Sequence, residues 1–119
     1  MKISTATKLT RRYINKHKLD REGYTVEVCN ILDGAQGRTV FTDRKILLDR
    51  TFILASDYTS LKYVVVHEIA HCLTPHDEHG EDWADKVIEV GGYNTDSINH
   101  ALECFRDRAR ESQKQWKEH

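Results

Sequence analysis

Residues 58–73 read YTSLKYVVVHEIAHCL, and no other stretch of the chain constrains the fold and the chemistry as strongly. The spacing of its apolar residues predicts a helix, which Asp57 or Ser56 can cap at its start. Pro75 is expected to end it, because the residue before a proline avoids helical backbone angles. Apolar side chains cover nearly the whole surface of this helix, so we expect it to lie in the centre of the domain.

The one polar face of this helix carries His67, Glu68 and His71 in the pattern H-E-x-x-H. Residues four apart share a helix face, so the two imidazoles can bind one zinc ion. Glu68 lies one step around, where its carboxylate can take a proton from a zinc-activated water that attacks a carbonyl. The alternative is a polar face hydrogen-bonded within the core, but these three groups are costly to bury without a metal. The pattern predicts a hydrolytic zinc site with Glu68 as general base.

A third zinc ligand has to come from elsewhere, since a hydrolytic site keeps three protein ligands and leaves the fourth position to water. The metzincin pattern is excluded, because it needs glycine and histidine at the positions that Thr74 and Asp77 occupy. Gly80 favours the histidine before it, because glycine permits a tight backbone where the next helix begins. The candidates that the residues leave open are His79, His76, Glu89 and Asp77.

The sequence after the helix resembles the SprT-like zinc metallopeptidases, the family that includes the Spartan proteases. The H-E-x-x-H pattern is followed by residues 79–83, HGEDW, which are similar to the H-G-x-x-W segment of that family. The resemblance covers roughly residues 38–92. It implies that His79 completes the zinc site with His67 and His71, and that Trp83 packs beside that site. The protein would be a short form without the four-cysteine zinc ribbon that some members carry.

The resemblance further implies a zinc-dependent metallopeptidase that hydrolyses peptide bonds in a protein substrate, with DNA-associated proteins as one class. Charge does not add support for DNA, because 18 Lys and Arg against 19 Asp and Glu give a net charge of −1. A zinc-binding interaction module with little turnover is the alternative. The presence of Glu68 favours the enzyme, since a purely structural zinc site has no use for a base.

The rest of the sequence predicts an α+β, zincin-like fold in one domain over residues 1–119. We expect an N-terminal helix over 4–19 with a basic face, then three strands over 24–31, 38–42 and 45–49. The strands would form a small, mostly antiparallel sheet. After the central helix, two further helices are expected over residues 80–90 and 96–116.

The cysteines and the other histidines and tyrosines give weaker indications of function. Cys29, Cys72 and Cys104 form no C-x-x-C pair, which favours reduced thiols. We expect a cytoplasmic protein (host cytoplasm if phage-encoded), because residues 1–18 lack the apolar run of a signal peptide and no stretch reaches the roughly 18 apolar residues of a membrane span. The candidates for an oxyanion donor, with core packing as the alternative, are the arginines, Tyr58, Tyr63 and Tyr93. The remaining histidines that are expected to be ordinary are His17 and His100.

Overall fold

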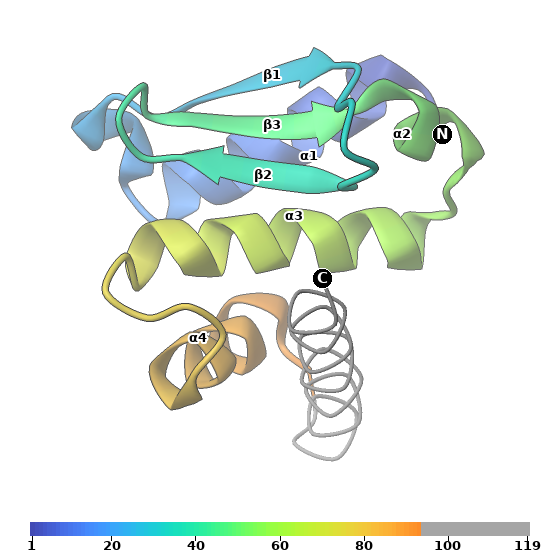
Figure 1. Ribbon diagram of the computed structural model, residues 1–119. Coiled ribbons are helices and arrows are strands. Elements are labelled where there is room, and N and C mark those ends of the chain that lie inside the picture. The colour runs from blue at the N-terminus through green and yellow to red at the C-terminus, as the bar shows by residue number, and fades with distance from the viewer. Residues whose placement is uncertain (94–119) are drawn as a thin grey trace, which may run out of the picture.

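A computed structural model of the protein describes residues 1–93, which form an α+β arrangement around one hydrophobic core (Figure 1). The elements follow the expected order of a helix, three strands, a central helix and a further helix, so the predicted fold class is confirmed. Their bounds are α1 Ile3–Lys16, the short 3-10 helix η1 Leu19–Glu22, β1 Thr25–Cys29, β2 Gly37–Val40, β3 Lys45–Asp49, α2 Arg50–Ala55, α3 Tyr58–Leu73 and α4 Glu81–Gly91.

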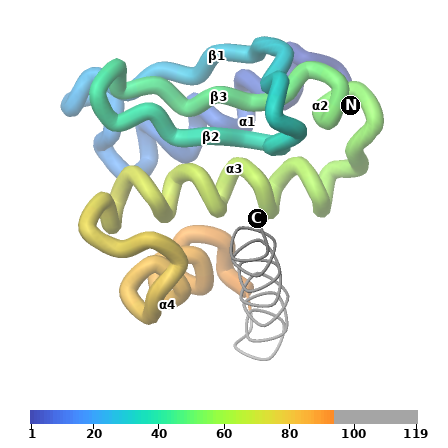
Figure 2. The backbone as a smooth tube through the Cα atoms, in the orientation of Figure 1, coloured from blue at the N-terminus to red at the C-terminus, as the bar shows by residue number. Residues whose placement is uncertain are grey.

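The sheet is mixed, whereas the sequence suggested a mostly antiparallel one. Its strand order is β1-β3-β2, so β3 is central and β2 lies at an edge. β1 pairs with β3 in parallel, and β2 pairs with β3 antiparallel. The polypeptide leaves β1 and enters β2 at the end of the sheet where β3 leads into α2, which places β2 on the far side of β3 (Figure 2). The register pairs Gly37 with Leu48 and Val40 with Lys45.

Helix α2 was not predicted from the sequence. Its first turn is capped by Asp49, whose carboxylate accepts a hydrogen bond from the main-chain N–H of Phe52 at 3.0 Å. The same carboxylate accepts from the N–H of Ile31 at 2.9 Å, so it ties the β1–β2 connection to the end of β3. Six residues make fewer than two turns, and so short a segment shows no periodicity that can be recognised in sequence.

Helix α3 has the bounds that the sequence predicted. The Asp57 carboxylate caps it by accepting from the N–H of Ser60 at 2.8 Å, and Thr74, just before Pro75, follows its last residue. Half of its residues are buried, on more than one face, because α1 and β2 pack on one side and α4 on the other. Figure 1 shows α3 running beneath the sheet and above α4. The central position that its apolar sequence predicted is confirmed.

The N-terminal helix α1 packs against the core with one face. Helix α1 buries Ala6, Leu9, Thr10 and Ile14 against the core, which leaves its basic residues on the outer side. Within residues 1–93, no helix is both long enough and apolar enough to cross a membrane. The helix predicted over residues 96–116, with His100 and Cys104, lies outside the described residues, so the prediction of one domain over the whole sequence stays a prediction.

Candidate metal centre

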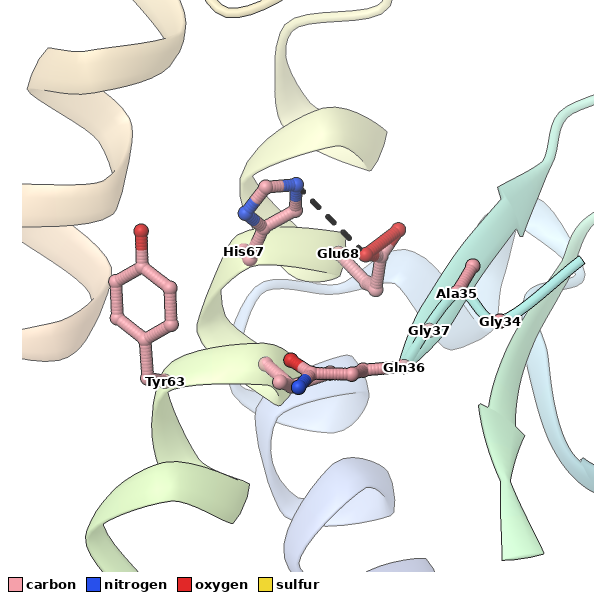
Figure 3. Close-up of a pocket in the computed structure, with 8 residues that line it drawn as sticks. Gly34, Ala35, Gln36, Gly37, Tyr63, His67 and Glu68 are labelled. Atoms are coloured by element: carbon pink, nitrogen blue, oxygen red, sulfur yellow. Dashed lines mark ion pairs between the residues drawn. The ribbon is translucent and has the colours of Figure 1, made fainter. Parts of the chain in front are cut away.

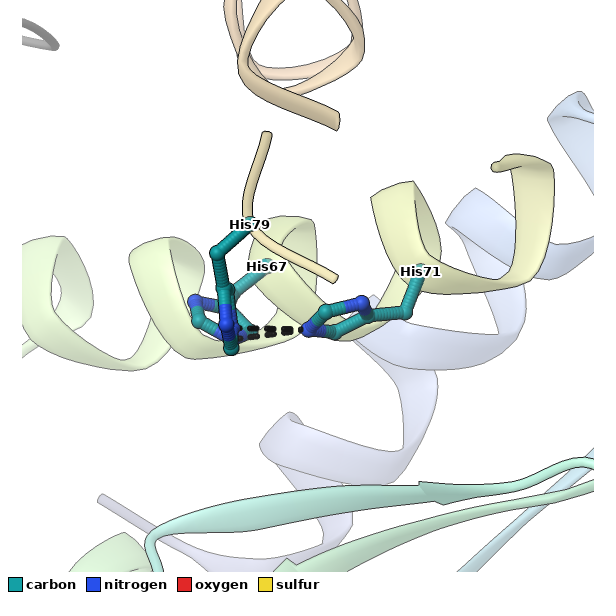
Figure 4. Close-up of side chains that lie close together, drawn as sticks. All are labelled: His67, His71 and His79. Carbon is teal, nitrogen blue, oxygen red and sulfur yellow. Dashed lines mark hydrogen bonds between the residues drawn. The ribbon is translucent and has the colours of Figure 1, made fainter. Parts of the chain in front are cut away.

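Two parts of the protein bring three histidines together (Figure 4). His67 and His71 lie one turn apart on α3, and His79 comes from the loop between α3 and α4. The Nε2 atoms form a nearly equilateral triangle, with separations of 3.1 Å for His67–His71, 3.1 Å for His71–His79 and 3.2 Å for His67–His79. Within residues 1–93 this is the group of histidine, cysteine and acidic side chains whose ligand atoms converge closely enough for a metal.

The triangle fits a zinc ion better than it fits hydrogen bonding. In a neutral imidazole, each Nε2 either carries a proton or offers a lone pair, so it donates or accepts but not both. Three Nε2 atoms in mutual contact therefore force at least one pair of like groups together. A tetrahedral zinc ion with bonds of about 2.0–2.1 Å holds its nitrogens about 3.4 Å apart. The observed separations are close to this value, so the three side chains suit one ion.

Burial keeps the histidines in the neutral form that a metal needs. Burial, together with the neighbouring imidazoles of His71 and His79, lowers the pKa of His67 from its ordinary 6.5 to about 3. Burial likewise lowers the pKa of His71 to about 4, and it lowers the pKa of the more exposed His79. Metal ligation by histidine requires the free lone pair, so protons compete weakly for this site near neutral pH.

Asp77 fixes the loop that presents His79. Its carboxylate accepts from the main-chain N–H of Gly80 and of Trp83, both at 3.0 Å. Gly80 is required for this packing, because a Cβ atom there would overlap the Asp77 carboxylate. The backbone of His79 itself has a φ of 63°, a left-handed conformation that is uncommon for a non-glycine residue, although less so for histidine than for most. The carboxylate of Asp77 therefore braces the loop that carries His79 and lies outside the histidine triangle.

Trp83 packs against all three histidines. The side chain is 1% exposed, and its ring centroid lies 4.8 Å from those of His67 and His79 and 5.5 Å from that of His71. Its indole N–H donates to the main-chain oxygen of His67 at 3.4 Å. The packing that the SprT-like resemblance implied for Trp83 is therefore present in the structure.

Glu68 is buried beside the triangle and points back to the sheet. The residue is 5% exposed, and its Oε1 accepts from the hydroxyl of Thr39 on β2 at 3.0 Å. The other oxygen, Oε2, lies 3.9 Å from the Nε2 of His67. Burial raises the pKa of Glu68 from 4.5 to about 7, although the Thr39 hydrogen bond and the charge of Arg38 oppose this shift. A carboxylate with such a pKa can exchange protons near neutral pH.

A cleft runs past these side chains. Two adjoining pockets share Gly37, His67 and Glu68, and Figure 3 shows residues 34–37 on one side of it with Tyr63 and the two α3 side chains on the other. Gly37 allows the close approach, because a Cβ there would lie 2.9 Å from a methyl group of Val64. The cleft is thus bounded by the edge strand β2 and by helix α3, which carries Glu68.

The competing ligand candidates lie elsewhere or have other roles. The Nε2 of His76 faces the Asp82 carboxylate at 3.0 Å on the surface, outside the triangle. Glu89 pairs with Lys86, also at the surface. The geometry therefore favours His79 over His76, Glu89 and Asp77.

The tyrosines proposed as oxyanion donors differ in whether they line the cleft. Tyr63 lines the cleft with its ring centroid 6.2 Å from that of His67, whereas Tyr58 is exposed. The Tyr93 hydroxyl is buried without a hydrogen-bond partner, and burial raises its pKa to about 12. Burial also raises the pKa of Cys72 to about 12, so it is a thiol and neither a ligand nor a nucleophile. The structure thus leaves Tyr63 as the one of these tyrosines that lines the cleft next to His67 and Glu68.

Sequence reasoning missed Thr39 and the bracing role of Asp77. A hydrogen bond between residues 29 positions apart leaves no signal in a single sequence, because it depends on how β2 packs on α3. For Asp77 the local signal is weak, because it lies three residues before the N-cap position, which Gly80 occupies.

No protein-family model and no curated protein matches the sequence. Among solved structures, the fold is similar to that of the metallopeptidase zymogen of Methanocaldococcus jannaschii jannalysin, with a TM-score of 0.67 over 87% of this protein and 95% of that one. The protein described here has a metallopeptidase fold. The sequence identity is 13%, so the likeness concerns the fold alone. The SprT-like family and the activity stay predictions.

Proposed function

We propose that the protein is a zinc-dependent metallopeptidase of the SprT-like type. The observation that carries the proposal is the carboxylate of Glu68, whose Oε2 lies 3.9 Å from one corner of the His67, His71 and His79 triangle. Three imidazoles with an adjacent base are the donor set of a hydrolytic zinc site, whereas a structural site has four protein ligands and no base. The HGEDW segment of residues 79–83 supports the SprT-like type.

The side chains then have separate roles. His67, His71 and His79 would hold the ion through their Nε2 atoms. A bound zinc ion supplies Lewis acidity, which polarises a peptide carbonyl and lowers the pKa of water to about 7. Glu68 accepts the proton of the attacking water and passes it to the leaving amine.

Within residues 1–93, β2 has one edge that pairs with no other strand, which supports an extended peptide as the substrate. The N–H of Asp49 donates to the carbonyl of Gln36 at 3.0 Å, so ladder bonds to β3 fall on even-numbered residues of β2. The main-chain groups of Gly37 and Thr39 therefore point away from β3, at the rim of the cleft. An extended peptide that pairs with this edge would lie along the pocket that Gly37 and Thr39 share with His67 and Glu68.

Removal of the metal tests this proposal. The protein treated with a chelator and dialysed should not cleave a denatured protein such as reduced, alkylated casein, and one equivalent of zinc should restore cleavage. Cleavage that survives chelation would contradict a zinc peptidase. Zinc binding at one equivalent without any cleavage would instead favour the interaction module.

A further inference from the structure

We propose that Thr39 is a positioning residue for the base: its hydroxyl holds one carboxylate oxygen of Glu68 so that the other faces the histidine triangle. This inference rests on the proposed function, since it gives Glu68 the role of base. Thr39 belongs to the edge strand β2 and is 29 residues from Glu68 in sequence. The hydrogen bond therefore joins the strand at the rim of the cleft to the helix that carries the chemistry.

The contacts divide the two oxygens of the carboxylate between two tasks. Oε1 accepts from the Thr39 hydroxyl at 3.0 Å, and Oε2 is the oxygen that lies near His67. The main-chain oxygen of Glu68 also lies 3.2 Å from this hydroxyl, so the one proton that Thr39 donates is shared between two acceptors of the same residue. A carboxylate held at one oxygen has little freedom to turn, which keeps the second oxygen in one place.

The position of β2 and the burial of Glu68 explain why a hydroxyl at residue 39 orients the carboxylate. Because Gly37 lacks a Cβ, β2 approaches α3 until that position is in contact with the Val64 and Glu68 side chains. Thr39 follows two residues later and therefore points to the same face of the sheet, toward α3. Glu68 is almost fully buried, so water cannot readily replace a lost hydrogen bond to its carboxylate.

A missing hydroxyl should affect the chemical step and leave metal and substrate binding intact. None of the three histidine nitrogens depends on Thr39, so zinc should still bind at one equivalent. A base that is no longer oriented lowers kcat while KM stays the same, because the lost interaction orients the base during proton transfer. The loss of an outer hydrogen-bonding partner at a metal site typically lowers activity by about 10- to 100-fold.

The test compares Thr39→Val, which keeps the shape and removes the hydroxyl, with Thr39→Ser, which keeps the hydroxyl. Zinc content, thermal unfolding and steady-state cleavage of a fluorogenic peptide are measured for each zinc-loaded protein. For Thr39→Val we expect kcat to fall about 10- to 100-fold with KM within about twofold, and for Thr39→Ser we expect recovery to near the wild-type value. Thr25→Val, an exposed position on the opposite edge strand, is the matched control.

Other outcomes would overturn the inference. A kcat for Thr39→Val within about twofold of wild type would do so, as would a Thr39→Ser variant as slow as Thr39→Val. Thr39→Ala takes the place of the valine variant if that protein does not fold. A wild type without activity would refute the proposed function instead. Crystal structures of wild type and Thr39→Val then decide about Thr39: the Glu68 carboxylate should lose its single rotamer in the variant, and an unchanged rotamer would contradict its role.

Discussion

His79 occupies a backbone conformation that costs free energy unless its surroundings compensate. A φ of 63° places His79 in the left-handed region, which few non-glycine residues adopt, although histidine adopts it more often than most. Such conformations concentrate at functional sites, where neighbouring contacts impose them. Here the result is the position of the imidazole, whose Nε2 lies within 3.2 Å of the two nitrogens on α3.

The first prediction concerns the two histidines of this loop. His79→Ala should weaken zinc binding by more than the roughly 100-fold that loss of an outer partner can cost, because it removes a ligand. His76→Ala should leave zinc affinity unchanged, since His76 faces Asp82 at the surface. A competition titration against a chromophoric chelator measures both variants. A larger loss for His76→Ala would mean that the structure assigns the third ligand wrongly.

At this scale the sequence predicted the three histidines that converge in the structure better than the side chains that support them. His67 and His71 follow from helical spacing, and the H-G-x-x-W resemblance favoured His79, which the structure places in the triangle. Thr39 could not be predicted, because its contact with Glu68 depends on a strand and a helix that only folding brings together. The identities of metal-binding residues are encoded locally, whereas their hydrogen-bonding partners are set by tertiary packing.

The loop between α3 and α4 carries His79 and also caps the first turn of α4. The Asp77 carboxylate accepts from the N–H of Trp83 in the first turn of α4, and thus caps a helix whose own N-cap residue, Gly80, has no side chain. The same carboxylate holds Gly80, the residue after the ligand. These hydrogen bonds lower the pKa of Asp77, so the cap is fully charged at neutral pH.

The second prediction therefore concerns Asp77. Asp77→Ala should lower zinc affinity by about 10- to 100-fold, because His79 is no longer fixed in its conformation. Asp85→Ala is the control: it removes an exposed acid of α4 outside the histidine triangle and should keep wild-type affinity. Calorimetric zinc titration of both variants measures the difference. Equal affinities would show that the loop does not need this brace.

Among the elements, local sequence signals were sufficient to predict the ends of α3 but not the pairing of the strands in the sheet. Asp57 and Pro75 mark the two ends of α3, and the predicted bounds are confirmed. The parallel pairing of β1 with β3 could not be predicted, because pairing depends on the path of the polypeptide and not on the composition of either strand. Helix α2 is too short to show a period.

In the whole molecule, the buried titratable groups make the zinc-free protein sensitive to acid. His67 and His71 have an ordinary pKa of 6.5 in the unfolded state but pKa values of about 3 and 4 when folded, so between pH 6.5 and 4.5 the unfolded state binds two more protons. Glu68 acts oppositely, because its pKa rises from 4.5 to about 7 and the folded state keeps one proton there. As the pH falls, the unfolded state therefore takes up more protons than the folded state, so the free energy of unfolding decreases.

The third prediction follows from this balance. The melting temperature of the zinc-free protein should drop on the order of 5 °C between pH 7 and pH 5. The double variant His67→Gln, His71→Gln should lose this drop, since neither glutamine takes a proton. Thermal unfolding followed by circular dichroism at the two pH values measures both proteins. A melting temperature that stays constant or rises in acid would refute the lowered histidine pKa values.

The proposed role of Thr39 assumes that Glu68 is the base of a zinc peptidase. The variant Glu68→Gln tests this assumption directly. The amide keeps the shape of the side chain and cannot accept the proton of the attacking water. We predict one equivalent of zinc in both proteins and a loss of casein cleavage of about 100-fold or more in the variant, in line with the loss of a general base. Equal cleavage by wild type and Glu68→Gln, with zinc present in both, would contradict this role.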